Sequence, residues 1–289
     1  MPEADAAAFD ALRPRLTRIA SRMLGSVADA EDVVQDAYLR WHGVERASIR
    51  SAEAFLVRVV TRLCLDQLKS ARARRETYVG PWLPEPLIEG PSTDLERSDE
   101  ITLSLMVALE RLSPLERAAF QLHDVFDVPF EEVARSLDRD PATCRQLASR
   151  ARTHVRADRR RFPLPPDQGR RLAEAFFAAS QRDDVAALER LLAADAVLMT
   201  DGGGRAAAAL NPIHGSTRIA RFFAGLARKF EAAQASFLRH ALVDGLPGYL
   251  SRDAQGALQT TALLIRDERI AAIYVTRNPE KLRHLDRGA

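Results

Sequence analysis

The sequence lacks several features that would point to particular classes of protein. It has no signal peptide and no run of about 18 apolar residues, which argues against a membrane span and for the cytoplasm. Its two cysteines, Cys64 and Cys144, lie far apart on apolar helical stripes, a placement that favours buried thiols over a disulfide or a metal site. Zinc-ligand spacing, a phosphate-binding loop and a nucleophile elbow are also missing, so we expect no metal and no cofactor.

The net charge is close to zero, at +2, but the basic residues are unevenly placed. Between Ala142 and Arg161 there are seven arginines and a single acid, Asp158. Residues 40–75 carry nine Lys or Arg against three acids. Two separated basic segments suggest two contacts with one polyanion.

Residues 129–156 have the pattern of a helix-turn-helix. The first helix carries one apolar stripe, and Asp140-Pro141 supplies the N-cap and the first-turn proline of a second helix. The second helix leaves a polar face outward, which comprises Thr143, Arg145, Gln146, Ser149, Arg150, Arg152 and Arg156. Such a helix suits a DNA major groove. The turn lacks the glycine often found there, and an ordinary helical hairpin with a solvated basic face is the alternative.

Two earlier helices are also expected. Residues 29–41 predict a helix with an acidic outer face, which serves either solvation or protein binding. Ser51 caps a long helix from Ala52 to about Arg75. On that helix a row of cations suits a phosphate track, with a solvated face as the alternative. The row contains Arg58, Arg62, Lys69 and Arg72, flanked by Thr61 and Asp66. The loop between the two helices, residues 41–50, is long enough to hold an unstacked base.

A proline-rich linker follows, and the texture of the sequence changes after a second one. Residues 78–91 cannot continue a helix, yet Trp82 and Leu83 are costly to leave in water, so we expect them to pack on another part of the chain. Beyond the second linker the pattern predicts helices and then antiparallel strands at 236–243, 247–252, 257–266 and 270–276. This order indicates an α+β domain.

The segments AEDVVQDAYLRW, AFLVRVVTRLCLDQLKSARARRE and LSPLERAAFQLHDVFDVPFEEVARSLDRDPATCRQLASRARTHVR resemble regions 2 and 4 of extracytoplasmic-function sigma factors. The resemblance implies binding to core RNA polymerase through Asp32, Gln35 and Asp36. It implies contact with the −10 promoter element for Arg58, Thr61, Arg62, Asp66, Lys69 and Arg72. It implies reading of the −35 element by Thr143, Arg145, Gln146, Ser149 and Arg150. Many members carry an asparagine where this chain has Arg62, which leaves the −10 base preference open.

The string GPWLPEPL resembles the linker of a subgroup whose C-terminal extension is SnoaL-like, with a cystatin-cone (NTF2-like) fold. Residues 201–205, DGGGR, and 278–282, NPEKL, resemble motifs of that extension. We therefore expect a regulatory contact between the linker and this domain. Its residues would be Trp82, Leu83, Asp201, Gly202, Gly203, Asn278 and Pro279.

These inferences give a multidomain chain. The expected parts are region 2 at 1–77, a linker at 78–98, region 4 at 99–161, a linker at 162–169 and the SnoaL-like domain at 170–289. The function expected is that of a sigma factor which joins core RNA polymerase on promoter DNA and is regulated in cis by its C-terminal domain, in the manner of an anti-sigma protein.

Two other functions are open alternatives. One is a helix-turn-helix regulator that works without polymerase. The other is an isomerase or hydrolase with a vestigial DNA-binding half, for which Asp201, His214, His240, Tyr249 and Tyr274 could supply acid–base groups. We expect no enzymatic activity, and fold analogy leaves room for a small regulatory ligand in the C-terminal domain.

Overall fold

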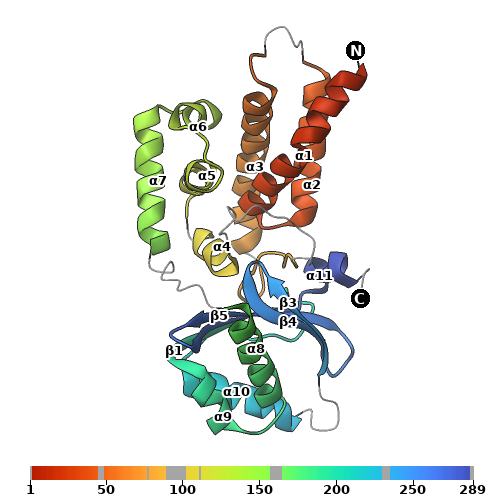
Figure 1. Ribbon diagram of the computed structural model, residues 1–289, viewed down its shortest axis with the longest axis vertical. Helices are drawn as coiled ribbons and strands as arrows, with labels where there is room; N and C mark the ends of the chain where they lie inside the picture. The colour runs from red at the N-terminus through yellow and green to blue at the C-terminus, as the bar shows by residue number, and fades with distance from the viewer. Residues whose placement is uncertain are drawn as a thin grey trace. The chain divides into compact units, whose positions relative to one another are not determined.

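The computed structural model describes residues 2–44, 49–76, 78–88, 102–110, 112–156, 165–229 and 235–286. By its internal contacts the chain divides into two units (Figure 1). The first joins Met1–Glu76 to Leu105–Asp158, and the second joins Thr77–Ser104 to Arg159–Ala289. The proline-rich linker therefore belongs to the same unit as the C-terminal domain. Within the described ranges, every helix is too short or too polar to cross a membrane.

Three helices open the first unit: α1 (Pro2–Leu24), α2 (Val27–His42) and α3 (Ala52–Glu76). Gly25 adopts a φ of 69° between the first two, and the Ser26 hydroxyl then caps α2 by accepting from the Asp29 N–H at 3.2 Å. All three contribute to one apolar core, which includes Phe9, Ile19, Val33, Trp41, Leu56 and Val60. The two helices predicted at 29–41 and from Ala52 are confirmed as α2 and α3, while residues 45–48 of the loop before α3 lie outside the described residues.

The chain continues with α4 (Leu103–Leu109), whose first two residues belong to the second unit. The remaining helices of the first unit are α5 (Pro114–Phe120), a π-helical turn (Gln121–Val125), α6 (Phe130–Leu137) and α7 (Pro141–Arg156). α5 starts with a capping box, in which the Ser113 N–H donates to Glu116 at 3.0 Å and the Glu116 N–H donates to Ser113 at 3.3 Å. α6 and α7 form the predicted helix-turn-helix.

The turn between α6 and α7 forms without a glycine. Asp138 occupies the left-handed region itself, with φ 55° and ψ 52°, which a short polar side chain tolerates better than a branched one. Two residues later, Asp140 accepts from the Thr143 N–H at 2.8 Å and so caps α7 as predicted.

Both cysteines are free and buried, as predicted. Burial raises the pKa of both thiols, Cys64 between the first helices and Cys144 on α7. Because the thiolate is the reactive form, both residues act as small apolar core groups.

The second unit contains a six-stranded sheet with the order β2-β1-β6-β5-β4-β3. Its strands are β1 (Leu192–Asp201), β2 (Ile213–His214), β3 (Ser236–Val243), β4 (Leu246–Arg252), β5 (Leu258–Arg266) and β6 (Arg269–Thr276). β1 runs parallel to β6, and the other pairs are antiparallel. The four predicted strands are confirmed as β3 to β6. Asp267 and Glu268 form the turn between β5 and β6, with φ values of 50° and 58°.

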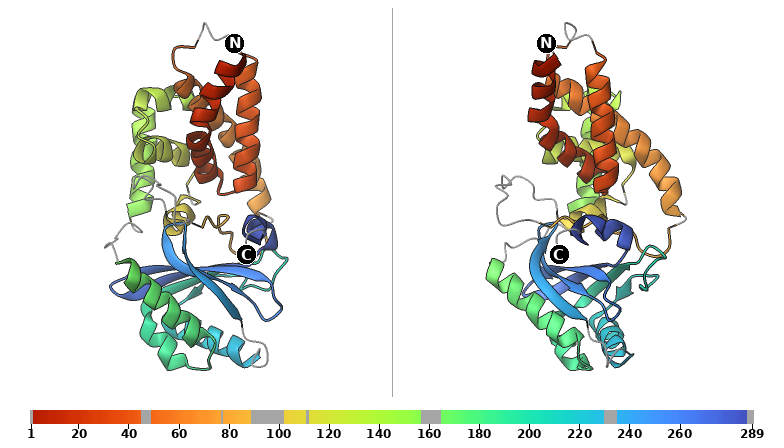
Figure 2. Two further views of the ribbon diagram at one scale, coloured as in Figure 1. Left: turned by 45° about the vertical axis from the view of Figure 1, so that its right-hand side comes forward. Right: turned by 90° about the vertical axis from the view of Figure 1, so that its right-hand side faces the viewer.

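Helices cover both faces of this sheet. α8 (Pro166–Ser180), α9 (Val185–Leu191) and α10 (Ser216–Lys229) pack on the face that we call the inner face, which carries Tyr249, Leu263 and Ile273. The C-terminal helix α11 (Pro279–Asp286) lies on the opposite, outer face (Figures 1 and 2). Leu250 and Leu258 of that face contact Leu282 of α11 and Ile88 of the linker.

Two details differ from the expectations. α8 begins at Pro166, so residues 166–169 are its first turn and not linker, because proline is favourable at the first helical position. Helix α11 was not expected, although the NPEKL segment begins it. The rest of the second linker, residues 162–164, and residues 89–98 of the first lie outside the described residues.

Candidate nucleic-acid interface and linker contact

α7 presents a polar face over a buried stripe. Its buried residues are Cys144, Ala148, Ala151 and Val155. Arg145, Gln146, Ser149 and Arg150 are exposed, as the helical period predicted. Thr143 is half-buried, and its hydroxyl donates to Asp140 at 2.6 Å, so this residue takes part in the cap.

Neighbouring elements hold this helix in place. The Arg145 guanidinium lies 5.8 Å from the ring centre of Phe130, which itself stacks on His123. Arg152 is half-buried and pairs with Asp124 at 2.7 Å, so it belongs to the scaffold and not to the free polar face that the pattern predicted.

α3 carries the row of cations for which the sequence predicted a phosphate track. Arg62 and Lys69 are exposed, Arg58 is half-buried, and Lys69 pairs with the exposed Asp66 at 3.0 Å. The side chain of Arg72 lies outside the described residues.

Thr61 flanks this row along the helix, as predicted, but it is buried. Its exposed fraction is 0%, because it lies one helical turn from Val57 and from Cys64, which belong to the buried face of α3. A direct DNA contact by Thr61 is therefore not available in this conformation.

α2 separates its two faces cleanly. Val33, Val34 and Ala37 are buried. Asp32, Gln35 and Asp36 are exposed on the other side, where a protein partner can reach them.

The linker is fastened to the C-terminal domain by Asp201, whose exposed fraction is 0%. Its carboxylate accepts from the Tyr78 hydroxyl at 2.5 Å and from the Leu83 N–H at 2.8 Å. The Lys281 ammonium forms an ion pair with it at 2.7 Å. Burial and the bond to Asp201 raise the pKa of Tyr78, so its phenol stays protonated and keeps donating.

Lys281 and Asn278 complete the same arrangement from the start of α11. The Lys281 ammonium also donates to the Leu83 carbonyl and lies 4.1 Å from the ring centre of Trp82. The side chain of Asn278 donates to the Tyr78 hydroxyl at 2.9 Å and accepts from the Glu280 N–H at 3.0 Å. Pro279, next in sequence, takes the first position of α11.

The glycines after Asp201 are needed for close approach. Gly203 has a φ of +59°, and a Cβ there would lie 2.2 Å from the side-chain nitrogen of Asn278. A Cβ on Gly202 would lie 2.1 Å from the carbonyl oxygen of Ala206. Any side chain at either position would push the linker or the loop away.

A second set of bonds holds the linker further along. The Asp244 N–H donates to the Leu87 carbonyl at 2.8 Å, and the Leu87 N–H donates to the Asp244 carboxylate at 3.2 Å. His284 Nε2 lies 2.9 Å from the Pro86 carbonyl oxygen. We call the set formed by residues 78–88 with Asp201, Asp244, Asn278, Lys281 and His284 the linker contact.

The other residues expected at this contact lie around Asp201 in the structure: Trp82, Leu83, Gly202, Gly203, Asn278 and Pro279. The roles of Tyr78, Asp244, Lys281 and His284 were not predicted from the sequence. A tyrosine at the start of an otherwise apolar linker could have indicated a hydrogen bond from Tyr78. The pairing of Lys281 with Asp201 follows only from the fold.

The five acid–base candidates do not converge. Asp201 lies on the linker side, His214 is exposed on β2, and His240 pairs with Glu174 at 3.1 Å. Of these five, Tyr249 lines the cavity of the C-terminal domain. Among the described residues, no group of three or more His, Cys, Asp or Glu is arranged to hold a metal ion.

Comparisons with known proteins agree with both units. Residues 8–74 match the family Sigma-70 region 2, and residues 102–155 match Sigma-70 region 4. The chain is 38% identical over 286 residues to the ECF RNA polymerase sigma factor SigJ of Mycobacterium tuberculosis, which covers 94% of this chain and 91% of that protein. It is 36% identical over 191 residues to the probable ECF RNA polymerase sigma factor SigI of the same species, covering 64% and 66%.

The crystal structure of the M. tuberculosis SigJ protein is similar over nearly the whole chain. The TM-score is 0.76 at 36% sequence identity, and the match covers 96% of this chain and 98% of that one. The arrangement of helical domains followed by a helix-and-sheet domain is thus shared with a solved structure.

Replacing Asp201 tests the linker contact. Asp201→Asn removes the negative charge that faces the buried Lys281, so we expect the second unit to lose about 3 kcal/mol of stability. Hydrogen exchange in residues 78–88 should become faster. The control is Asp195→Asn, because Asp195 pairs with Arg266 on the surface and its loss should cost less than about 1 kcal/mol. Urea unfolding and exchange mass spectrometry measure both, and equal effects of the two variants would contradict the contact.

Proposed function

We propose how this chain works from one established premise: it belongs to the extracytoplasmic-function RNA polymerase sigma factors, and its role is in transcription initiation. The observation that supports the assignment of parts most directly is the face of α7, where exposed Arg145 and Gln146 sit over a fully buried stripe. Each region is assigned its own role.

In this proposal α7 enters the major groove at the −35 element. Arg145 and Gln146 have side chains able to make bidentate bonds to base edges, each good pair discriminating by ~1–3 kcal/mol. Arg150 and Ser149 contact the phosphates beside them. The contact of Arg145 with Phe130 and the pairing of Arg152 with Asp124 fix the angle of the helix before DNA is bound.

In this proposal α3 contacts the −10 half of the promoter, and α2 contacts the polymerase. Arg58, Arg62, Lys69 and Arg72 anchor phosphates of the −10 element, and each neutralised phosphate releases a counterion. Asp66 lies among these cations and stays a candidate for contact with the melted strand. Asp32, Gln35 and Asp36 form the acidic face of α2 that binds core polymerase.

The C-terminal domain acts in cis through the linker contact. A linker whose residues 78–88 are bonded to the sheet and to α11 cannot extend freely between the two DNA-reading parts. The contact therefore restrains promoter engagement in the way that a separate anti-sigma protein would. This regulatory role rests on the geometry of Asp201 and Lys281.

The domain is proposed to work without catalysis. Among its described residues the most buried carboxylate is that of Asp201, which already accepts from three donors of the linker and α11. The carboxylate at the cavity, Asp253, pairs with Arg277 at 2.5 Å and accepts two backbone N–H groups. Neither is free to take a proton from a substrate.

Charge removal on α2 distinguishes a sigma factor from a polymerase-independent regulator. The double variant Asp32→Asn, Asp36→Asn should bind core RNA polymerase at least about tenfold more weakly, since rim charges of one sign steer and hold a complementary partner. Asp10→Asn on α1, also an exposed acid, is the control. Fluorescence anisotropy of labelled chain with core enzyme gives the affinities. Unchanged binding of the double variant would favour the regulator that works alone.

Arg145→Ala tests base reading by α7. The dissociation constant of the holoenzyme for a promoter selected from a library should rise about tenfold, as expected for one lost bidentate contact. Arg170→Ala on α8 is the matched control, because Arg170 is an exposed arginine paired with Glu174 and outside both DNA-reading helices. The effect should vanish on a promoter with a scrambled −35 element, and its persistence there would assign Arg145 to a phosphate.

Regulation in cis predicts a gain of transcription when the linker is released. Output from the selected promoter, measured in vitro with core polymerase, should rise about fivefold for Asp201→Asn, a typical size for coupling between sites. Asp195→Asn should leave it unchanged. Equal output from wild type and Asp201→Asn would contradict the regulatory role while leaving the sigma-factor assignment intact.

A further inference from the structure

A cavity of about 320 Å³ lies between the inner face of the sheet and helices α8 and α10. Its volume falls in the range of small-molecule pockets. Three aromatic side chains form much of its wall: Phe177 from α8, and Phe222 and Phe223 from α10. These rings give the cavity an apolar body.

A small polar group, made of one residue each from α8, β4 and β5, faces the same space. The Tyr249 hydroxyl is hydrogen-bonded to the side chains of Thr261 and Ser180, and all three residues line the cavity. Burial raises the pKa of Tyr249 to about 12, so the phenol is uncharged throughout the physiological range. The site therefore offers hydroxyl donors and acceptors without charge.

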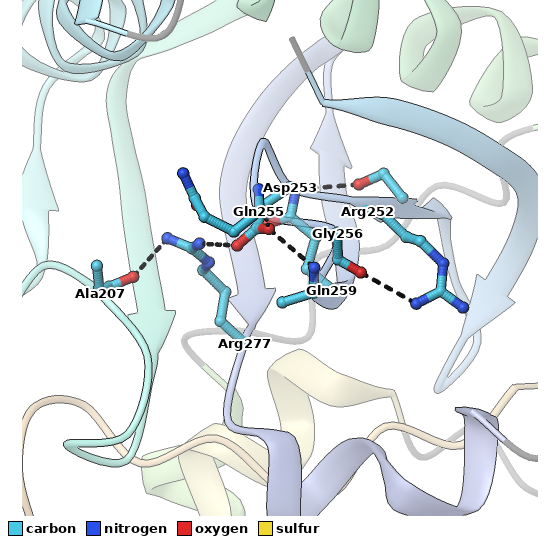
Figure 3. A network of polar contacts seen from close by, with 9 residues as sticks. Ala207, Arg252, Asp253, Gln255, Gly256, Gln259 and Arg277 are labelled. Atoms are coloured by element: carbon cyan, nitrogen blue, oxygen red, sulfur yellow. Dashed lines mark hydrogen bonds and ion pairs between the residues drawn. The ribbon is translucent and has the colours of Figure 1, made fainter. Parts of the chain in front are cut away.

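The charged groups of the lining leave little net charge for a ligand. Asp253 and Arg277 neutralise each other in an ion pair, which Figure 3 shows together with the bond from Arg277 to the Ala207 carbonyl at 2.5 Å. Lys229, at the last turn of α10, is exposed to solvent. The lining thus fits a molecule that is itself uncharged.

One loop separates this cavity from the linker. In residues 202–212, Ala207, Ala208 and Ala209 line the cavity, and Thr200 accepts from the Ala209 N–H at 2.7 Å. On the other side of the same loop the linker passes closely. A Cβ on Gly80 would lie 3.8 Å from the Ala209 carbonyl oxygen.

The ends of β1 and β6 repeat this two-sided arrangement. Neighbouring residues of β1 point to opposite faces, and the two residues that follow β6 also point to opposite sides. Thr200 faces the cavity, and Asp201 next to it holds the linker. Arg277 borders the cavity, and Asn278 next to it bonds Tyr78. Because the two residues of each pair are adjacent in the chain, a movement of Thr200 or Arg277 at the cavity also moves Asp201 or Asn278 at the linker.

We propose that the cavity binds a small, uncharged, largely apolar molecule bearing at least one hydrogen-bonding oxygen or nitrogen, and that binding alters the linker contact through loop 202–212. The molecule packs between the phenylalanine rings and bonds the hydroxyl group of Tyr249. It displaces Ala207–Ala209, whose far side touches the linker. The coupling rests on the proposed regulatory role, whereas the binding site stands without it.

The test uses the full chain and the uncharged fluorescent probe N-phenyl-1-naphthylamine. We expect saturable binding that Ala227→Phe, which fills the cavity from α10, weakens at least about tenfold. Arg221→Phe places the same ring on the exposed side of α10 and should leave binding unchanged. Because Ala227→Phe could disturb packing, Ala254→Trp in the β4–β5 turn blocks the cavity from another element. Absence of saturable binding, or wild-type affinity in both filling variants, would overturn the site.

Hydrogen exchange of residues 78–88, measured with and without the probe, tests the coupling. We expect the probe to change the exchange rate of this segment at least about threefold in the wild type and in Arg221→Phe, and not in the filling variants. Saturable binding with unchanged exchange would overturn the coupling alone. Neither readout involves transcription, so a failure here is distinct from a failure of Asp201→Asn to change promoter output.

Discussion

The buried pair of Asp201 and Lys281 is the interaction on which the C-terminal unit depends. Two charges taken out of water are stable only when their remaining hydrogen-bonding capacity is met, and here the linker meets it. The Tyr78 hydroxyl and the Leu83 N–H donate to the Asp201 carboxylate. The Lys281 ammonium donates to the Leu83 carbonyl and contacts the Trp82 ring. Without the linker, the domain would hold an incompletely satisfied charge pair, so the two segments are stable as one structure.

The proline-rich segment therefore has a structural role in the C-terminal unit. Prolines keep residues 81–86 extended and leave its backbone groups available to partners outside any helix. Those groups bond Asp201, Asp244 and His284, while Leu83 is fully buried. The segment is therefore part of a folded domain, and a change within that domain has a direct route to the connection between the Sigma-70 region 2 and region 4 segments.

The helical half was largely predictable because its signals are local. The apolar period of α7, the cap at Asp140 and the capping box at Ser113 each depend on residues within four positions of one another. The exceptions have tertiary causes. Thr61 lies on the buried side with Val57 and Cys64, and Arg152 is drawn into a pair with Asp124, 28 positions away.

The sequence alone determined the type and order of most elements, α11 excepted, together with the buried cysteines and most of the polar faces of α2, α3 and α7, because period and capping act over a few residues. It also singled out Asp201 and Asn278 through their motifs. Only the tertiary structure decided that Lys281 and Tyr78 meet at Asp201, that α11 covers the outer face, and that a cavity lies on the other side of the same strand ends. These contacts join residues 80 to 200 positions apart, and no local pattern specifies such pairs.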